Sequence, residues 1–421
     1  MLDIKLICNN FNNVVKKLAS RGYELDIKKI KTLLEIRNKL KTNTETLQNK
    51  RKIISKTIGN NKNYILKVQK LFVKVKKINH KLHKNILCLE VTNKKIYNIL
   101  FKIPNLPHNS VPIKTNIEII RWGVPKSFNF SIRDHIKIGL LNGDIDFELA
   151  TKITGSNFTL IRGNLAKLHR ALIQFMLDKQ INDHGYEEMY VPYIINRTSL
   201  VGTGQLPQFN KNVFELEGEK EYFLIPTAEV PLVNSVSGKL FNVNDLPIKL
   251  TAHSPCFRNE PVSYGTDSRG MLRQLQFDKI ELVQIVHPEK SYVVLEDMTN
   301  HAEEILKALN LPYRVISLCK EDISFCASKT YDIEVWIPSL ETYLEISSIS
   351  NCEDFQARRI KTRFRINKDK AKPKFVHTLN GSGLAVGRCL LAVLEYYQNE
   401  DGSITVPDSL RSYMCGINRL Y

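Results

Sequence analysis

The apolar residues of the first hundred positions recur at helical spacing, in two stripes. The first stripe is interrupted at Asn43 and Lys50 and consists of Leu33, Ile36, Leu40, Leu47 and Ile54. The second consists of Val68, Phe72, Val75, Asn79, Leu82, Ile86, Leu89, Asn93, Ile96 and Leu100. Spacings of three, four and seven residues are typical of a heptad seam. They predict an antiparallel coiled-coil hairpin over about residues 27–100 that turns at 59–61, after a short helical lead-in over 1–22.

Beyond this region helical and strand periods alternate, which predicts an α+β fold. Three prolines, Pro104, Pro107 and Pro112, mark a linker, and residues 113–160 have no clear pattern. Helical spacing predicts helices over 164–183, over 288–309 and around Arg388. Strands are predicted at 190–192, 213–216, 222–225, 331–338, 342–350 and 375–379. A glycine-rich turn is expected at 380–383, and an exposed loop over the basic run 358–374.

Residues 254–285 predict two antiparallel strands joined by a long loop. Period-two alternation puts Arg258 and Glu260 on one face of the first strand, and Arg273, Phe277 and Glu281 on one face of the second. Guanidinium groups bind phosphate or carboxylate, an aromatic ring stacks on a base, and carboxylates accept from amines or hydroxyls. Such a surface fits a nucleotide beside a small zwitterion. The alternative is a half-buried sheet with solvated charges on its open side.

The composition is that of a folded globular protein with two or three domains. The chain has 421 residues, of which 43% are hydrophobic, and it contains neither a secretion signal pattern nor an apolar run long enough to span a membrane. Its eight cysteines form no CxxC pair. We therefore expect reduced thiols, no zinc site, no membrane association and a cytoplasmic location.

The positive charge is concentrated in the predicted coiled coil. The first hundred residues carry 24 Lys and Arg against 6 Asp and Glu, which accounts for the whole net charge of +18. A basic appendage of this kind favours a polyanionic partner, and nucleic acid above all. The alternative is an interaction or dimerisation coil whose lysines are simply solvated.

Three smaller patterns carry candidate chemistry. Thr227 and Glu229 stand at a predicted strand end, where they can bind an ammonium group or cap the following helix. Glu345, Ser347 and Ser348 lie on or beside a strand, where they can hold a divalent ion next to phosphate or decorate a surface. The glycines at 381, 383 and 387 resemble a dinucleotide-binding fingerprint, but too little chain follows for a Rossmann unit. They can instead let the backbone approach a ligand closely.

Together these patterns resemble the class II aminoacyl-tRNA synthetases. Residues 164–192 resemble motif 1, the hairpin at 254–285 resembles motif 2, and LNGSGLAVGR at 379–388 resembles motif 3. The TAE triplet at 227–229, the EVWIP and EISSISNCEDFQARR stretches and the paired basic helices are similar to the bacterial seryl-tRNA synthetases. The resemblance implies an antiparallel sheet with flanking helices and a homodimer formed through motif 1. It also implies a tRNA-binding domain over 1–105 and a catalytic domain over 106–421.

The resemblance implies activation of L-serine with ATP and Mg²⁺, followed by transfer to the 3′ end of tRNA(Ser), and it allows tRNA(Sec) as a second acceptor. The implied serine-binding residues are Thr227, Ala228, Glu229, Arg258, Glu281, Asn380 and Ser382. The implied ATP-binding residues are Arg258, Asn259, Glu260, Arg273, Phe277, Glu345, Ile346, Ser347, Ser348 and Arg388. The implied catalytic pair is Arg258 and Arg388, and the implied Mg²⁺ ligands are Glu345 and Ser348.

Within this resemblance the chain departs from the common pattern at three places, one of which is the segment LCKEDISFCASKTYD, which lacks the family's usual glycines. Asn259 stands where the family usually has Ser, and the loop PVSYGTDSRGM differs from the commoner AGSAGRDTRG. Two competing functions remain. One is a related ligase that loads an amino acid onto a carrier protein, which the long arm and the cysteine pattern disfavour. The other is a non-catalytic RNA-binding paralogue, which the intact Arg258, Glu260, Arg388 and TAE triplet disfavour.

Overall fold

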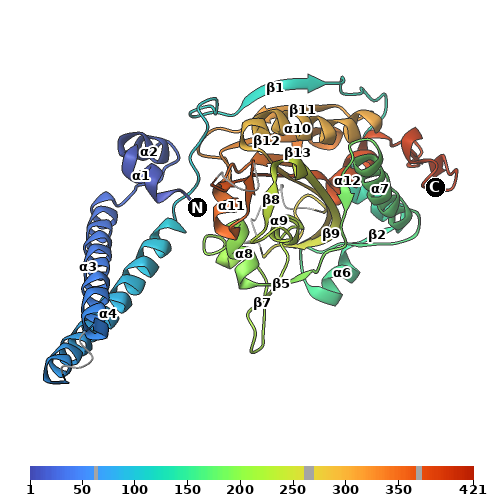
Figure 1. Cartoon of the computed structure of the whole chain (residues 1–421). Coiled ribbons are helices and arrows are strands. Elements are labelled where there is room, and N and C mark those ends of the chain that lie inside the picture. Colours follow the sequence, from blue (N-terminus) through green and yellow to red (C-terminus); the bar gives the residue numbers. More distant parts are fainter. Residues whose placement is uncertain (61–64, 260–269, 367–371) are drawn as a thin grey trace. The chain divides into compact units, whose positions relative to one another are not determined.

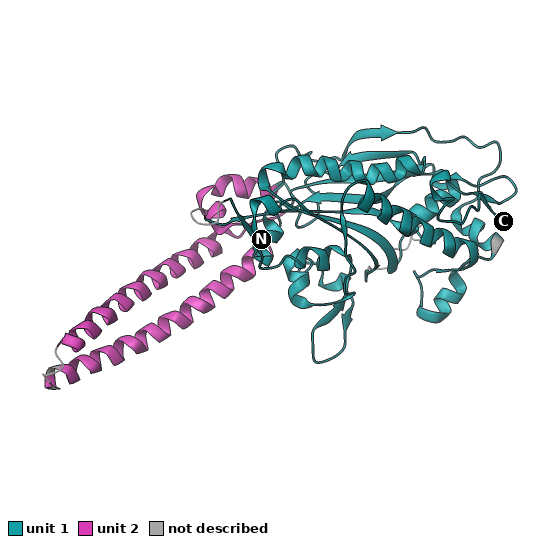
Figure 2. Cartoon of the chain, turned by 45° about the vertical axis from the view of Figure 1, so that its right-hand side comes forward, with its two compact units in different colours: residues 1–2, 20–22, 104–421 teal, residues 3–19, 23–103 magenta. Residues whose placement is uncertain are grey.

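The computed structural model of the chain describes residues 1–60, 65–259, 270–366 and 372–421 (Figure 1). The chain divides into two compact units (Figure 2). We call residues 3–19 and 23–103 the arm unit, and residues 1–2, 20–22 and 104–421 the sheet unit. No helix in the described ranges is both long and apolar enough to cross a membrane.

The arm unit is built of four helices within the described residues. Two short helices, α1 (Ile4–Asn9) and α2 (Phe11–Ala19), form the lead-in. Two long ones, α3 (Ile27–Asn60) and α4 (Ile65–Leu100), lie side by side as the predicted hairpin (Figure 1). At 1.5 Å per residue each long helix spans roughly 50 Å. The Arg37 side chain donates to the Asn93 side chain at 3.0 Å, which pairs the start of α3 with the end of α4.

The seam of this hairpin differs from the predicted stripes at alternate positions. In α4, Val75 and Leu82 are partly or fully covered as expected, but Phe72 is 57% exposed and Leu71 turns inward instead. In α3, Ile36 is 41% exposed, and Thr44 rather than Asn43 is buried. Adjacent residues of these helices are often both apolar or both polar, so the sequence does not distinguish which of the two belongs to the seam. Contact with the partner helix decides which one is buried.

The sheet unit is organised around one large sheet. Eight strands of the described residues form it, in the order β1 (Ile117–Trp122), β11 (Tyr313–Ser317), β12 (Lys329–Ile337), β13 (Thr342–Asn351), β16 (His377–Ala385), β10 (Gln276–Val286), β9 (Ile248–Phe257) and β4 (Glu187–Glu188). Neighbouring strands are antiparallel except β4, which runs parallel to β9. The α+β fold and the antiparallel pairing of the 254–285 hairpin are therefore confirmed. The strands are shorter toward the loop than predicted, because β9 ends at Phe257 and β10 begins at Gln276, so Arg258 and Arg273 lie outside them.

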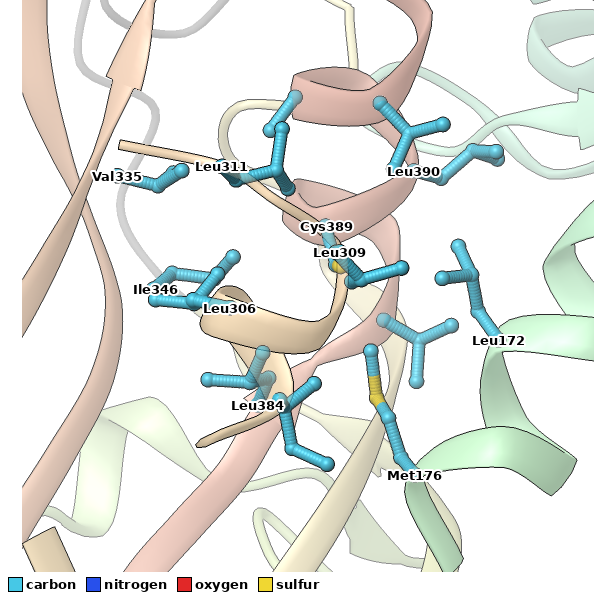
Figure 3. Packing of buried hydrophobic residues seen from close by; sticks show 14 of the residues in the cluster. Leu172, Met176, Leu306, Leu309, Leu311, Val335, Ile346, Leu384, Cys389 and Leu390 are labelled. Carbon is cyan, nitrogen blue, oxygen red and sulfur yellow. The ribbon is translucent and has the colours of Figure 1, made fainter. Parts of the chain in front are cut away.

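Three long helices pack their apolar stripes on one face of the sheet. They are α7 (Gly163–Asn182), α10 (Ser291–Ala308) and α12 (Val386–Tyr396). Figure 3 shows Leu172 and Met176 of α7 meeting Cys389 and Leu390 of α12, with Leu306 of α10 nearby. The helices predicted over 164–183 and 288–309 and around Arg388 are thus confirmed.

The opposite face of the sheet is covered over part of its length. Two short helices, α9 (Glu229–Asn234) and α11 (Phe355–Ile360), pack there against Val283 and Ile285 of β10. Earlier along β10 the same face carries Phe277, Lys279 and Glu281. Because alternate residues of a strand share a face, β10 presents an apolar half beneath the helices and a polar half beside them.

The remaining elements are short and connect or extend this framework. They are α5 (His135–Asn142), β2 (Ile145–Asp146), α6 (Phe147–Thr154), β3 (Leu160–Ile161), β5 (Ile194–Asn196), α8 (Arg197–Thr203), β6 (Glu215–Leu216), β7 (Tyr222–Leu224), β8 (Leu240–Asn242), β14 (Arg363–Arg365), β15 (Lys374–Phe375), β17 (Ile404–Thr405) and β18 (Arg419–Leu420). Strands β6 and β7 lie within the ranges predicted for them.

Three local predictions were wrong. The strand expected at 190–192 lies instead at Glu187–Glu188, because Val191 packs into the core and Pro192 has no N–H to donate to a neighbouring strand. Residues 380–383 are not a turn but the middle of β16. Glycine is needed there for packing, since a Cβ at Gly381 would lie 2.7 Å from the Ile349 side chain. The run 358–374 is not simply an exposed loop, because it includes the end of α11, strand β14 and the first residue of β15.

Candidate active site

The polar half of β10 forms the floor of a pocket of about 240 Å³. Its lining comes from β10, from the segment before β10, from β13 and from the junction of β16 with α12. The lining residues are Arg258, Met271, Leu272, Arg273, Gln274, Phe277, Lys279, Glu345, Ile346, Ser382, Ala385, Gly387 and Arg388. Seven of the predicted site residues therefore meet in one cavity, although they lie in four separate stretches of sequence.

Arg258, which directly follows β9, lies over the ring of Phe277 on β10. The Arg258 guanidinium lies 5.2 Å from the centroid of the Phe277 ring, in cation–π contact. Its Nε donates to the Pro226 carbonyl at 3.3 Å. Its terminal nitrogens donate to none of the residues that the structure describes, so they can meet a ligand. The pair thus places a positively charged guanidinium group beside a flat aromatic ring.

Arg388 enters the same pocket from the first turn of α12. Its Nε donates to the Leu272 carbonyl at 3.2 Å, and one terminal nitrogen donates to the Glu345 carbonyl at 2.6 Å. That nitrogen also lies 3.7 Å from the Glu345 carboxylate. Three contacts to two other segments fix this guanidinium, so it is held in place before any anion arrives.

A buried polar network extends the pocket inward. The Thr227 hydroxyl donates to Glu281 Oε2 at 2.6 Å, and Lys279 Nζ lies 2.9 Å from the Thr227 hydroxyl and 2.5 Å from Glu281 Oε2. The Glu229 N–H donates to the Thr227 hydroxyl at 3.2 Å. Thr227 therefore supports the start of α9 as a cap would, and it also belongs to the polar network. A threonine, a lysine and a carboxylate meet here within the protein interior.

Glu229 is the most perturbed acid of this network. Its side chain lies next to that of Glu281, and one oxygen accepts a hydrogen bond from Gln356 at 2.7 Å. Burial, reinforced by the Glu281 charge, raises the pKa of Glu229 to about 7, although Gln356, Lys279 and Arg258 act in the opposite direction. A buried carboxylate beside a second carboxylate favours a cationic ligand.

Strand β16 supplies two further predicted residues to this face. Ser382 lies directly opposite Glu281, and Asn380 lies opposite Val283. The Cys352 thiol donates to the Asn380 side-chain oxygen at 3.6 Å. Because residues 378, 380 and 382 alternate along one strand, their side chains share the face that carries Glu281.

The hairpin of β12 and β13 brings two carboxylates together. Asp332 pairs with Ser348 across the hairpin, and the Ser348 hydroxyl acts to lower the pKa of the Asp332 carboxylate. Burial, with Glu345 close by, raises the pKa of Asp332 to about 7. Its Oδ1 is buried and has no hydrogen-bond partner in the described structure. This arrangement of excess negative charge suits a divalent cation.

The other predicted site residues lie at the margins. Ala228 packs into the apolar cluster beneath α9, and Asn259 is exposed, with its N–H donating to the Asn212 carbonyl at 3.0 Å. The Ser347 hydroxyl is buried and donates to the Ser382 carbonyl at 2.6 Å. Glu260 and the loop that follows it lie outside the described residues.

Sequence reasoning missed three residues that the structure adds. Lys279 lies between Phe277 and Glu281 on the same face, so the period-two pattern alone would have found it. Asp332 and Gln356 carry no such signal, because they come from β12 and α11 and reach the site only through tertiary packing.

Comparison with known proteins gives a consistent result over the whole chain. A model of the seryl-tRNA synthetase N-terminal domain matches residues 1–107, and a model of the tRNA synthetase class II core domain (G, H, P, S and T) matches residues 213–397. The serine–tRNA ligase of Janthinobacterium sp. (strain Marseille) is 52% identical, over 100% of this chain and 99% of the relative. That of Cellvibrio japonicus (strain Ueda107) is 53% identical, over 99% and 98% respectively.

A solved structure agrees with these sequence relatives. The crystal structure of the seryl-tRNA synthetase from Pyrococcus horikoshii, complexed with ATP, superposes with a TM-score of 0.92 at 32% identity. The match covers 100% of this chain and 99% of the other. The likeness extends through the helical hairpin as well as the sheet.

Proposed function

Since this chain belongs to the seryl-tRNA synthetase family, we propose that the pocket above β10 is where it joins serine to ATP. The family membership makes the chain a serine–tRNA ligase that binds ATP. The observation that carries the residue assignment is the position of Lys279. It lines the pocket with Arg258 and also contacts Thr227 and Glu281, so the anion-binding surface and the buried acid network are continuous.

Serine is recognised by the buried network. Glu229 and Thr227 take its ammonium group, and Glu281, with Asn380 and Ser382 on the neighbouring strand, takes its hydroxyl. Alanine lacks the hydroxyl and would leave Glu281 with an unmet acceptor in a buried place, which is costly. Threonine must be excluded by shape, since its hydroxyl is similar and its extra methyl needs space.

ATP occupies the part of the pocket nearer to α12. Phe277 stacks on the adenine, Arg258 holds the α-phosphate and the serine carboxylate, and Arg273 and Arg388 hold the other phosphates. The serine carboxylate then attacks the α-phosphorus, and the bond to pyrophosphate breaks. In the second step the terminal tRNA hydroxyl attacks the acyl carbon, and AMP leaves. Arranging the two substrates and neutralising charge are sufficient, so no protein nucleophile is required.

Glu345 and Ser348 are the residues we assign to Mg²⁺. No group of three or more potential metal-ligating side chains occurs among residues the structure describes. Mg²⁺ commonly binds one or two carboxylates together with substrate phosphates, so this pair fits an ion that enters with ATP. Bound there, Mg²⁺ would neutralise phosphate charge as pyrophosphate departs.

We expect the affinity for serine to depend on pH through Glu229. Its pKa of about 7 means that the carboxylate is mostly protonated at pH 6 and mostly ionised at pH 8. Because only the ionised form attracts an ammonium group, the KM for serine in ATP–pyrophosphate exchange should be about tenfold higher at pH 6 than at pH 8. The groups that surround this acid are Glu281, Lys279, Arg258, Cys326 and Cys352.

The variant Glu229→Gln is the control for this dependence. It should bind serine weakly at every pH, so its KM for serine should be the same at pH 6 and at pH 8. A KM for serine that does not change over this range in the parent protein would contradict the assignment of Glu229 to the ammonium group.

The Mg²⁺ assignment is tested by Glu345→Gln. This variant should need about tenfold more Mg²⁺ for half-maximal ATP binding, measured by equilibrium dialysis without serine or tRNA. Glu341→Gln, which changes an exposed carboxylate at the tip of the same hairpin, is the matched control and should leave the Mg²⁺ requirement unchanged. If both variants behave like the parent, Glu345 is not a Mg²⁺ ligand.

The assembly and the RNA partners complete the proposal. The enzyme acts as a homodimer formed through the region of α7 and β4, with a tRNA-binding domain over 1–105 and a catalytic domain over 106–421. The basic arm lies along tRNA(Ser), and it crosses to a tRNA held mainly by the other subunit. The family resemblance supports tRNA(Sec) as a second acceptor.

A further inference from the structure

The Glu229 carboxylate is held by a side chain that belongs to neither the ATP pocket nor the serine network. Gln356, from the first turn of α11, is fully buried and donates to Glu229 Oε1 at 2.7 Å. The same nitrogen donates to the Thr203 carbonyl at the end of α8, at 3.2 Å. The Gln356 oxygen accepts from the Thr378 hydroxyl at 2.7 Å. One amide thus joins three elements to Glu229.

The orientation of this amide is determined by its neighbours. The Thr203 carbonyl can only accept a hydrogen bond, so the nitrogen of Gln356 must face it. The Thr378 hydroxyl, which is itself fully buried on β16, can donate to the Gln356 oxygen that remains. The nitrogen is therefore fixed toward Glu229 rather than free to turn its oxygen there. An oxygen in that place would repel the carboxylate.

Thr378 also connects Glu229 to the other side of the serine site. It lies on β16, two residues before Asn380 and four before Ser382, on the same strand face. Any displacement of β16 would move Thr378 and the residues assigned to the serine hydroxyl together. The bond to Gln356 thereby couples the position of the ammonium ligand to that of the hydroxyl ligands.

From this geometry we propose that Gln356, locked by Thr378, is a positioning residue that holds Glu229 ionised and aimed at the serine ammonium group. The inference rests on the proposed serine site. It assigns to Gln356 no contact with ATP or with serine itself. Its loss should therefore weaken serine binding while sparing ATP binding, and it should move the pH at which serine binding fails.

The test is steady-state ATP–pyrophosphate exchange by Gln356→Met, which keeps the side-chain volume and removes both donors. The KM for serine should rise about tenfold to a hundredfold, while the KM for ATP stays within about twofold of the parent. Because the amide favours the ionised carboxylate, the pH below which serine binding weakens should move upward in this variant. Thr378→Val removes only the hydrogen bond that orients the Gln356 amide. It should raise the KM for serine by a smaller factor.

Two controls separate the inference from folding defects and from the proposed function. Gln284→Met removes an equally buried glutamine, whose nitrogen donates to Tyr186 at 2.8 Å, and should leave both KM values unchanged. Glu229→Gln tests the serine site directly. If Glu229→Gln raises the KM for serine but Gln356→Met and Thr378→Val do not, the positioning role is wrong and the serine site stands. If Glu229→Gln has no effect, the serine assignment itself fails.

A parallel rise in the KM for ATP would also overturn the proposal. It would mean that Gln356 supports the whole pocket rather than the carboxylate of Glu229.

Discussion

Deletion of the helical arm, residues 30–98, should abolish tRNA charging and leave serine activation nearly intact. All the described residues assigned to ATP and serine belong to the sheet unit, whereas the deleted residues belong to the arm unit. The first hundred residues also carry the entire net positive charge of the protein, so the deletion removes most of the net charge that attracts RNA phosphates. We expect charging to fall by roughly a hundredfold or more, measured as serine attached to tRNA(Ser).

The salt dependence of the full-length protein provides the control. Charging at limiting tRNA should weaken steeply as salt rises, because added salt makes the release of counterions from the RNA less favourable. ATP–pyrophosphate exchange without tRNA should change little. Equal loss of both activities on deletion would contradict the division of labour between the units. A charging rate that does not change with salt would favour the alternative, in which the arm is an interaction coil and its lysines contact solvent rather than RNA.

Replacement of Arg258 by alanine should reduce serine activation by about a thousandfold. This guanidinium is the proposed contact to both the α-phosphate and the serine carboxylate, which carry like charge and must approach each other. Its place beside Phe277 and its bond to the Pro226 carbonyl fix it before the substrates bind. The measurement is kcat/KM for ATP–pyrophosphate exchange. Arg258→Lys should recover little of the loss, because a lysine cannot form the two parallel bonds of a guanidinium.

Arg314→Ala is the matched control for this loss. Arg314 lies on β11 and pairs with Glu334 and Glu118 on the partly exposed edge of the sheet. Such pairs contribute little to stability, so this variant should remain folded and active. An Arg258→Ala protein that melts like the parent and keeps more than about a tenth of its activity would rule out the proposed role.

The elements that sequence predicted best are those whose pattern repeats over many residues. Strands β9 and β10 were predictable because a β-prone run leads into a recognisable loop and an alternating segment follows it, although β9 begins earlier and β10 later than the pattern indicated. The face of β10 that bears Phe277 and Glu281 followed from the same period. The long helices followed from heptads, but the exact seam did not, since Leu71 and Phe72 are both apolar and only the partner helix distinguishes them.

The elements that sequence predicted poorly depend on contacts between distant segments. The glycines at 381 and 383 suggested a turn, yet Gly381 is required because Ile349 packs directly against its backbone. Asp332 and Gln356 gave no local signal, because each acquires its role from a partner far away in the chain. Thr227 had two interpretations, as a helix cap and as a residue that binds an ammonium group. The structure shows the cap-like contact to the Glu229 N–H and a further hydrogen bond to Glu281, and the binding of an ammonium group stays a prediction.

In the proposed mechanism one continuous pocket activates serine and rejects its near relatives. The most direct measurement is ATP–pyrophosphate exchange without tRNA, in the presence of serine, threonine, alanine or glycine. We expect exchange with serine alone, and a preference over alanine of about 10⁴-fold in kcat/KM, because Glu281 would lack the hydrogen bond from the serine hydroxyl. Exchange with alanine at a similar rate, or no exchange with any of the four in correctly folded protein, would contradict it.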